Sequence, residues 1–158
     1  MSEASGQPGA GSPGAEHGRS RLRNTREEIE AAENQALEAA ARMGYPAASV
    51  FALRLALEEA MTNAFRHGHE SLPDEPIDLE WSIGPARAEF TIEDRGPGFK
   101  PETVPDPTLD ENLERPSGRG IMLMRAYMTD VRFNTRGNRV TMVYDRAAED
   151  AKRRAAAD

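Results

Sequence analysis

The sequence predicts an α+β fold in which helices are layered on one face of a largely antiparallel sheet. Between residues 25 and 67, apolar side chains recur at helical spacing. Residues 77–83 and 88–93 instead alternate between apolar and polar side chains, as strands with one buried face do. Helices followed by a run of strands favour a sheet that carries its helices on one side.

Length and composition favour one cytoplasmic domain. The chain has 158 residues, enough for one hydrophobic core, and none of its apolar runs is long enough to span a membrane. Its start lacks the basic and apolar segments of a secretion signal, and it contains no cysteine. The net charge of −7 and the lack of a basic stripe argue against nucleic acid or an anionic membrane as the main partner. We therefore expect a cytoplasmic protein that binds neither nucleic acid nor membrane.

The N-terminal part predicts a tail, a short strand and a first helix. Residues 1–19 are rich in Gly, Pro, Ser and Ala, which indicates a disordered tail. A short strand is expected near residues 21–23. Thr25 and Glu28 then fit a capping box, and the helix that they begin should end at Gly44.

The middle of the chain predicts a long helix followed by a hairpin. The helix should run from about residue 47 to 67, with Gly68 as its terminator. Residues 77–83 and 88–93 should pair as antiparallel strands around the turn at residues 84–85.

The last third predicts a loop, a short helix and a second hairpin. Residues 100–117 have no periodicity and contain four prolines, as expected for a lid over a site. A short helix should cover residues 121–129, and residues 131–133 and 140–144 should form a hairpin. The domain is expected to span residues 20–146, and residues 147–158 to form a charged tail or frayed helix.

Glu59 and Asn63 form the first candidate site. They lie four residues apart and therefore project from the same face of the predicted helix. A carboxylate can accept a proton from a hydroxyl nucleophile, and an amide oxygen can contribute one ligand to Mg²⁺. By themselves, the two residues could equally be solvated on the polar side of an ordinary helix. Glu58 projects about 100° away, towards Thr62, and we place it outside the site.

Asp94 forms the second candidate site. It ends a predicted strand and is followed by Gly96 and Gly98, which allow another group to approach the backbone closely. A carboxylate held there can accept a hydrogen bond from the exocyclic amine of adenine, whereas guanine would present a carbonyl oxygen to it. An ordinary turn between strand and loop is the alternative.

Gly118 and Gly120 form the third candidate site, directly before the short helix. Exposed backbone N–H groups and the positive end of a helix dipole suit a polyphosphate. Arg119 and Arg115 add cationic donors that could reach terminal phosphate oxygens. Alone, the segment could also be a glycine-rich loop with an exposed arginine.

Together and in this order, the three segments resemble the motifs of a GHKL-type (Bergerat) ATP-binding domain. The N box is Glu59-Ala-Met-Thr-Asn63, the first glycine box is Asp94-Arg-Gly-Pro-Gly98, and the second begins at Gly118-Arg-Gly120 and continues to Met124. The resemblance covers roughly residues 20–145. It implies a two-layer α/β sandwich with helices on one face of a mixed, mainly antiparallel sheet. Within that superfamily, the chain is most similar to stand-alone anti-sigma factor serine/threonine kinases.

The resemblance implies ATP and Mg²⁺ as cofactors and a role for each motif residue. Glu59 would be the catalytic base, Asn63 would ligate Mg²⁺, and Asp94 would bind the adenine amine. The pocket would be shaped by the glycines of both boxes: Gly96, Gly98, Gly118 and Gly120. The segment from about residue 100 to 117 would be the ATP lid. Such a site suits phosphoryl transfer, in which positioning and charge neutralisation do most of the catalysis.

The implied function is that of an anti-sigma factor and kinase acting in a partner-switching system that regulates transcription. It would bind a sigma factor and phosphorylate a serine of an anti-anti-sigma (STAS-type) protein, and a homodimer is possible. A non-catalytic module gated by ATP or ADP, which sequesters a regulatory partner, is the alternative. The catalytic half of a histidine kinase is less favoured because nothing upstream resembles a helical hairpin with a phosphoacceptor histidine. A gyrase-like or chaperone-like ATPase would need transducing domains.

Two further groups of side chains have simpler interpretations. His67 and His69 flank a glycine at the predicted helix end, where we expect them to act as a C-terminal cap pair. Met122, Met124 and Met128 are expected to pack in the core or an interface.

Overall fold

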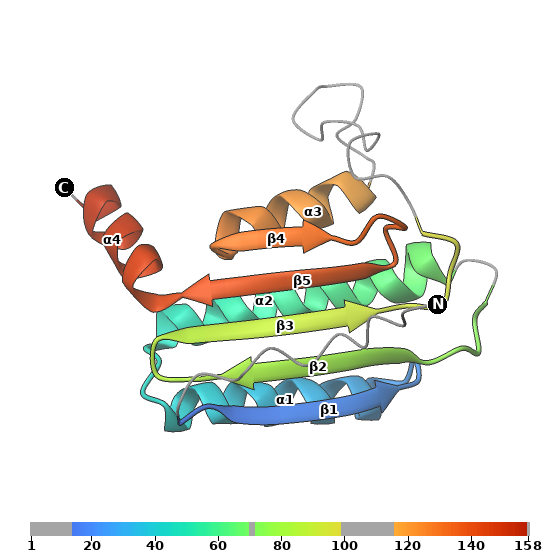
Figure 1. Cartoon of the computed structure of the whole chain (residues 1–158), viewed down its shortest axis with the longest axis horizontal. Helices are drawn as coiled ribbons and strands as arrows, with labels where there is room; N and C mark the ends of the chain where they lie inside the picture. The colour runs from blue at the N-terminus through green and yellow to red at the C-terminus, as the bar shows by residue number, and fades with distance from the viewer. Residues whose placement is uncertain (1–13, 70–71, 99–115, 158) are drawn as a thin grey trace, which may run out of the picture.

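A computed structural model describes residues 14–69, 72–98 and 116–157, and shows helices packed on one face of a sheet (Figure 1). The elements follow in this order: β1 (Glu16–Leu22), α1 (Arg26–Arg42), α2 (Ala47–Asn63), the π-helical turn η1 (Ala64–Gly68), β2 (Ile77–Ile83), β3 (Arg87–Glu93), α3 (Pro116–Tyr127), β4 (Asp130–Phe133), β5 (Arg139–Asp145) and α4 (Arg146–Ala157). The predicted α+β fold is confirmed. The predicted lid lies almost wholly outside the described residues.

The sheet has the strand order β1-β2-β3-β5-β4, and every described pair is antiparallel. The expectation of a mixed sheet is therefore not met in the described part of the chain. Two hairpins, β2–β3 and β4–β5, account for two of the pairs, and both predicted hairpins are confirmed. Glu93 of β3 pairs with Arg139 of β5. The residue after β3, Asp94, therefore lies next to the residue before β5, Asn138.

The core lies between the sheet and the helices α1 and α2. Alternate residues of the central strands point towards those helices and are buried, as in Leu79 and Ile83 of β2 or Phe90 and Ile92 of β3. α3 packs along α2, near the β4 edge of the sheet. Burial of this apolar face supplies the main stabilisation of the two layers.

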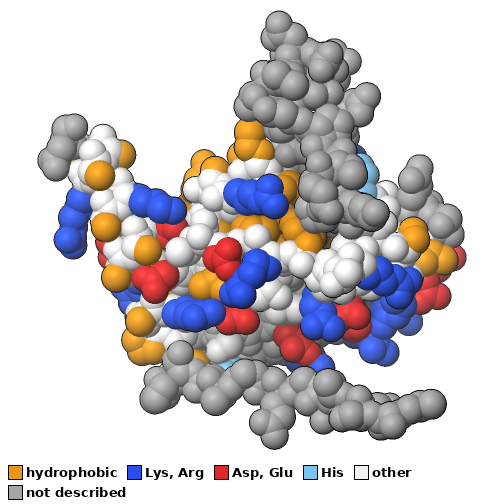
Figure 2. Space-filling model, turned by 45° about the horizontal axis from the view of Figure 1, so that its top comes forward, with side chains coloured by type: hydrophobic (Ala, Val, Ile, Leu, Met, Phe, Trp, Pro, Cys, Tyr) orange, Lys and Arg blue, Asp and Glu red, His pale blue; other side chains and the backbone are white. Residues whose placement is uncertain are grey.

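The opposite face of the sheet is polar. Ion pairs cross it between neighbouring strands, as Arg21 with Asp78 and Arg139 with Glu93. Figure 2 shows basic and acidic side chains interspersed over the part of this face that it displays. The apolar residues of the predicted alternation therefore lie on the inner face of the sheet, and the charged residues lie on the outer face.

The first strand begins earlier than predicted. Residues 16–19 were expected in a disordered tail, but they belong to β1, which pairs with β2 along its whole length. The reason is at Gly18, where a Cβ atom would lie 2.2 Å from the indole of Trp81. Because residue 18 is glycine, the large Trp81 ring can cover the edge strand β1. The sequence of β1 alone does not show this contact, since it depends on a residue of another strand.

The boundaries of the first helix agree with the prediction. Thr25 is the N-cap of α1, and its hydroxyl accepts a hydrogen bond from the N–H of Glu28 at 3.3 Å. The Glu28 carboxylate reaches back to the N–H of Arg23 at 3.0 Å. Gly44 follows the helix with a φ of 77°, the left-handed conformation that commonly ends a helix.

Of the two later helices, one differs from the prediction. α3 begins at Pro116, five residues before the predicted start at Ile121. The C-terminal segment forms the helix α4, one of the two predicted alternatives, and its first turns are fixed to the body, since Thr129 donates to the buried carboxylate of Glu149 at 2.9 Å. Within the described residues, no helix is both long and apolar enough to cross a membrane.

Met124 and Met128 are buried in the core, as predicted. Met122 is 41% exposed and so lies outside the core, and its place in an interface stays a prediction.

Candidate functional site

Glu59, Asn63 and Gly120 meet where α2 packs against α3. A Cβ atom on Gly120 would lie 3.1 Å from Glu59 Oε2 and from Asn63 Nδ2, and 3.2 Å from Asn63 Oδ1. Glu59 and Asn63 are half-buried, whereas the neighbouring Glu58 is exposed. The first and third candidate segments are therefore in contact, and Gly120 allows α3 to approach both side chains closely.

The helix that carries Glu59 and Asn63 widens directly after Asn63. The N–H of His69 donates to the carbonyl of Ala64 at 3.0 Å, which is the spacing of a π-helix. Such π-helical turns occur frequently at functional sites. The sequence predicted the extent of the helix, to Gly68, but not this change in its winding.

Gly68 brings the end of η1 against Asp94. A Cβ atom on Gly68 would lie 2.4 Å from Asp94 Cγ and Oδ2, so no other residue fits there without movement. Likewise, a Cβ atom on Gly96 would lie 1.8 Å from the carbonyl oxygen of Gly68. The second candidate segment is thus packed directly on the helix that carries the first.

The Asp94 carboxylate is buried in a tight turn. Its Oδ1 accepts a hydrogen bond from the N–H of Gly96 at 2.7 Å, and the residue is 9% exposed. Burial raises the pKa of the Asp94 carboxyl, and the N–H of Gly96 partly opposes that shift. Among the hydrogen bonds of the described residues, none is made to Oδ2, which faces Gly68.

The turn between β4 and β5 supports Asp94 from the other side. The Asn138 side chain donates to the Asp94 carbonyl at 3.0 Å, and the Asp94 N–H donates to the Asn138 carbonyl at 2.9 Å. Arg136 donates to the carbonyl of Gly96 at 3.1 Å. Gly98 has a φ of 83°, and a Cβ atom on it would lie 1.8 Å from the Arg136 carbonyl oxygen. Sequence reasoning missed Asn138 and Arg136, although the pairing of β3 with β5 could have identified them.

His69 was also missed. It is the C-cap residue of η1, as predicted, but the contact of its side chain was not expected: the residue is 2% exposed, and its Nε2 accepts a hydrogen bond from the N–H of Arg95 at 2.7 Å. His67 is exposed. The sequence contained no signal for this difference, since both histidines flank the same glycine.

The second glycine box lies inside the first turns of α3 and not ahead of it. Because α3 begins at Pro116, the N–H groups of Ser117, Gly118 and Arg119 have no acceptor within the helix. The N-terminal turn therefore still presents backbone donors and the positive end of the helix dipole. Arg119 is exposed, and Arg115 lies outside the described residues.

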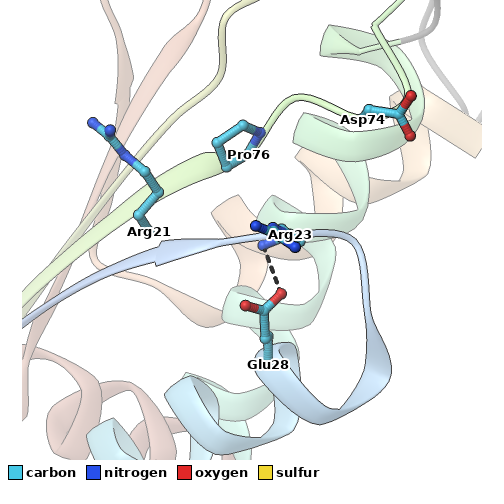
Figure 3. A pocket seen from close by; sticks show the side chains of 5 residues that line it. All are labelled: Arg21, Arg23, Glu28, Asp74 and Pro76. Carbon is cyan, nitrogen blue, oxygen red and sulfur yellow. Dashed lines mark hydrogen bonds between the residues drawn. The ribbon is translucent and has the colours of Figure 1, made fainter.

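A shallow open groove lies elsewhere, beside the start of α1. Figure 3 shows its lining residues: Arg21, Arg23, Glu28, Asp74 and Pro76. None of them is a predicted site residue, and the Glu28 carboxylate is already bonded to the N–H of Arg23. We therefore assign the site to the glycine-lined turns around Asn63 and Asp94.

The donor set at Asn63 suits Mg²⁺ only together with phosphate ligands. In the described part of the chain, no three His, Asp or Glu side chains are grouped so that they could hold a metal ion by themselves. A metal at Asn63 would take one amide oxygen from the protein and most other ligands from phosphate and water.

The chain matches known proteins over the part that contains this site. Residues 22–144 match the family described as the histidine kinase-like ATPase domain. The chain is 31% identical over 115 residues to a serine-protein kinase RsbW of Oceanobacillus iheyensis, which covers 69% of this chain and 73% of the relative.

Two other relatives are matched over a smaller share of their length. The RsbW serine-protein kinase of Bacillus subtilis is 31% identical over 101 residues, 59% of this chain and 62% of the relative. The anti-sigma F factor of Halalkalibacterium halodurans is 35% identical over 83 residues, 51% of this chain and 56% of the relative. The chain thus spans less than two thirds of these two relatives. With the family matched over residues 22–144 and the motifs in contact, the chain belongs to the histidine kinase-like ATPase domain family, as its GHKL-type motifs predicted.

Proposed function

We propose that this chain is an ATP-dependent serine/threonine protein kinase that acts as an anti-sigma factor. Its phosphoryl acceptor would be a serine of an anti-anti-sigma (STAS-type) protein, and its second partner a sigma factor. One observation carries the proposal: one continuous helical segment, α2 with η1, contacts both the Gly118–Gly120 segment and the Asp94 turn. The names of the relatives, serine-protein kinase and anti-sigma F factor, support the same function.

The helical segment sets the distance between the two ends of the site. From Glu59 to Gly68 it advances about 13 Å at a rise of about 1.5 Å per residue. An extended nucleoside triphosphate has a similar length. Asp94 at one end can therefore contact the base while Glu59 and Asn63 at the other face the terminal phosphates.

Each residue has a physical reason for its role. Oδ2 of Asp94, which has no hydrogen bond among the described residues, would accept one from the adenine amine, and a guanine carbonyl would be repelled there. Asn63 Oδ1 would ligate Mg²⁺, and the first-turn N–H groups of α3 would bind phosphate oxygens. ATP with Mg²⁺ supplies the phosphoryl group and neutralises its charge.

Glu59 would act as the base in the transfer. It is half-buried beside Asn63, so its carboxylate is held near the place where the substrate hydroxyl would enter. It would accept the proton of the serine hydroxyl as that oxygen attacks the γ-phosphorus, while the bond from the γ-phosphorus to the bridging oxygen breaks and ADP leaves. We further propose that the protein acts in the cytoplasm and can pair as a homodimer.

The test is phosphoryl transfer from labelled ATP to STAS-type proteins of the same organism. Glu59→Gln should lower the transfer rate by about 100-fold or more and leave ATP affinity within about twofold of wild type. Glu58→Gln is the matched control, since the adjacent carboxylate is exposed and should be dispensable.

Two outcomes would contradict the kinase role. Wild-type protein that binds ATP but transfers no phosphate to any such partner would support the ATP- or ADP-gated binding module instead. Equal transfer by Glu59→Gln and wild type would show that Glu59 is not the base.

A further inference from the structure

His69 is fixed at the end of η1 by contacts on several sides. Its ring packs edge-on against Phe65, with 6.2 Å between ring centroids and 75° between ring planes. Its N–H closes the π-helical turn on Ala64, and its carbonyl accepts from Leu72 at 3.0 Å. The imidazole therefore has little freedom to turn, and its orientation is set by the backbone that carries it.

One nitrogen of the His69 ring bonds to the turn that holds Asp94. Nε2 accepts the N–H of Arg95 at 2.7 Å, which requires a lone pair on that nitrogen and places the ring proton on Nδ1. Nδ1 is buried and has no hydrogen-bond partner within the described residues. A structural role alone would not favour a histidine with one unmatched nitrogen, because an unpaired buried donor is destabilising.

The bond to Arg95 acts on the position of the Asp94 carboxylate. Arg95 is the middle residue of the turn from Asp94 to Gly96, and the Gly96 N–H bonds to Asp94 Oδ1 at 2.7 Å. His69 holds this turn from the η1 side, and Asn138 holds it from the β4–β5 side at 3.0 Å. With both contacts in place, the direction of the Asp94 carboxylate is determined before any ligand arrives.

We infer that His69 is a positioning residue for base recognition: it holds the Asp94–Gly96 turn so that Asp94 discriminates adenine from guanine. The inference rests on the proposed ATP-binding function of Asp94. His69 contacts the turn and not the reacting atoms, so its loss should alter base preference more than it alters phosphate binding.

The test compares two substitutions of His69 with a control elsewhere. His69→Gln keeps a side-chain acceptor that can reach the Arg95 N–H, and His69→Leu removes it. Tyr144→Phe is the matched control, since it removes a buried hydrogen bond, to Ser49 at 2.7 Å, at the other end of the sheet. Calorimetric Kd values for ATP and GTP are measured for each protein, together with Tm.

His69→Leu should weaken ATP binding about tenfold and GTP binding less than about twofold, so that the preference for ATP falls several-fold. His69→Gln should retain the preference within about threefold of wild type. Tyr144→Phe should lower Tm and leave the preference unchanged. An unchanged preference in His69→Leu, with only a lower Tm, would overturn the inference.

A second readout separates this inference from the proposed function. Amide hydrogen exchange of Arg95, measured by NMR without nucleotide, should be faster in His69→Leu than in His69→Gln or wild type. If wild-type protein bound no ATP, the proposed function would fail, and this exchange rate would still decide whether His69 holds the turn. Equal exchange rates in all three proteins would overturn the positioning role.

Discussion

Buried polar groups lie at both ends of the sheet, but their hydrogen bonding differs between the Asp94 end and the α4 end. At the end where β3 leads into Asp94, glycines take the place of side chains, and the buried Nδ1 of His69 has no hydrogen-bond partner among the described residues. At the opposite end, where β5 leads into α4, the hydroxyl of Tyr144 bonds to Ser49 at 2.7 Å and accepts from Arg153 at 2.9 Å.

Arg146 makes further contacts at the α4 end. Its guanidinium donates to the carbonyls of Pro85 at 2.8 Å and Gly44 at 2.9 Å, and lies 4.4 Å from the ring centroid of Tyr45. The Tyr45 hydroxyl in turn donates to Gly84 at 2.7 Å. Each of these polar groups has a partner within the protein, so this end has no capacity left for a ligand.

Satisfied polar networks favour stability, whereas an unsatisfied buried group beside glycines marks a candidate binding site. Buried polar atoms are rarely left without a partner, so those that are need a specific explanation. Nδ1 of His69 is such an atom within the described residues, and its ring contacts the Asp94 turn through Nε2. Glu33 Oε1 and Trp81 Nε1 are also unpaired but lie away from it, so burial alone does not define the site.

The largest expected effect comes from adding a methyl group beside Asp94. In Gly68→Ala, the added methyl group would lie 2.4 Å from the Asp94 carboxylate and displace it. We expect ATP affinity, measured by calorimetry, to fall by about 100-fold or more because base recognition and the turn are both disturbed. Gly44→Ala is the control: nothing lies within 4 Å of its Cβ position, and its φ of 77° should cost only about 1 kcal/mol of stability. Normal ATP binding by Gly68→Ala would contradict the close packing of η1 on Asp94.

The second prediction concerns the hydrogen-bond network at the α4 end of the sheet. Tyr144→Phe removes the hydroxyl that joins Ser49 to Arg153, and should lower the free energy of unfolding by about 1 to 2 kcal/mol. ATP affinity should stay within about twofold of wild type, because the network lies at the far end of the sheet. Chemical denaturation and calorimetry on the same preparation measure both. A large loss of ATP affinity would show that the two ends are coupled, which the comparison does not predict.

The smallest effect concerns Glu33, the unpaired carboxylate outside the site. Burial raises the pKa of Glu33 to about 7, and its neighbour Glu58 adds to that shift, opposed by Arg54. Because the pKa in the folded protein is above the unfolded value of 4.5, the protonated form stabilises the fold. This contribution is complete below about pH 4.5 and is lost as pH rises through about 7.

Glu33→Gln removes this dependence. The substitution should raise the free energy of unfolding at pH 8 by about 1 kcal/mol. This value allows for solvent screening of the exposed Glu58 and Arg54. At pH 5 the free energy of unfolding should change little. Denaturation midpoints at the two pH values measure it. Equal effects at both would show that Glu33 stays ionised, and that an unpaired buried oxygen is tolerated away from the site.

The sequence predicted the local elements well because their signals are local. Alternation identified β2 and β3, and Thr25 identified the start of α1 through a capping box that the structure contains. It placed the end of the tail too late, since β1 is held by pairing with β2 and by the Trp81 ring over Gly18, which are contacts distant in sequence.

The candidate site divides in the same way. Glu59 and Asn63 follow from helical spacing, and Asp94 from its glycines, so the candidate residues could be named from the sequence, and their roles stay predictions. Asn138 and His69 act through the β4–β5 turn and through the π-helical turn, and neither the strand pairing nor the altered winding is encoded in a short motif. Residues that support a site are therefore harder to predict than residues that form it.

The central claim is that Asp94 and Asn63 bind opposite ends of one Mg²⁺–ATP, and its most direct test is ATP affinity measured with and without Mg²⁺. Wild-type protein should bind more tightly with Mg²⁺, and Asn63→Ala should lose that difference because the metal loses its protein ligand. Asp94→Asn should bind at least about tenfold more weakly in both conditions, since one amide oxygen cannot serve both the Gly96 N–H and the adenine amine. Equal ATP affinity of all three proteins, in both conditions, would contradict the account.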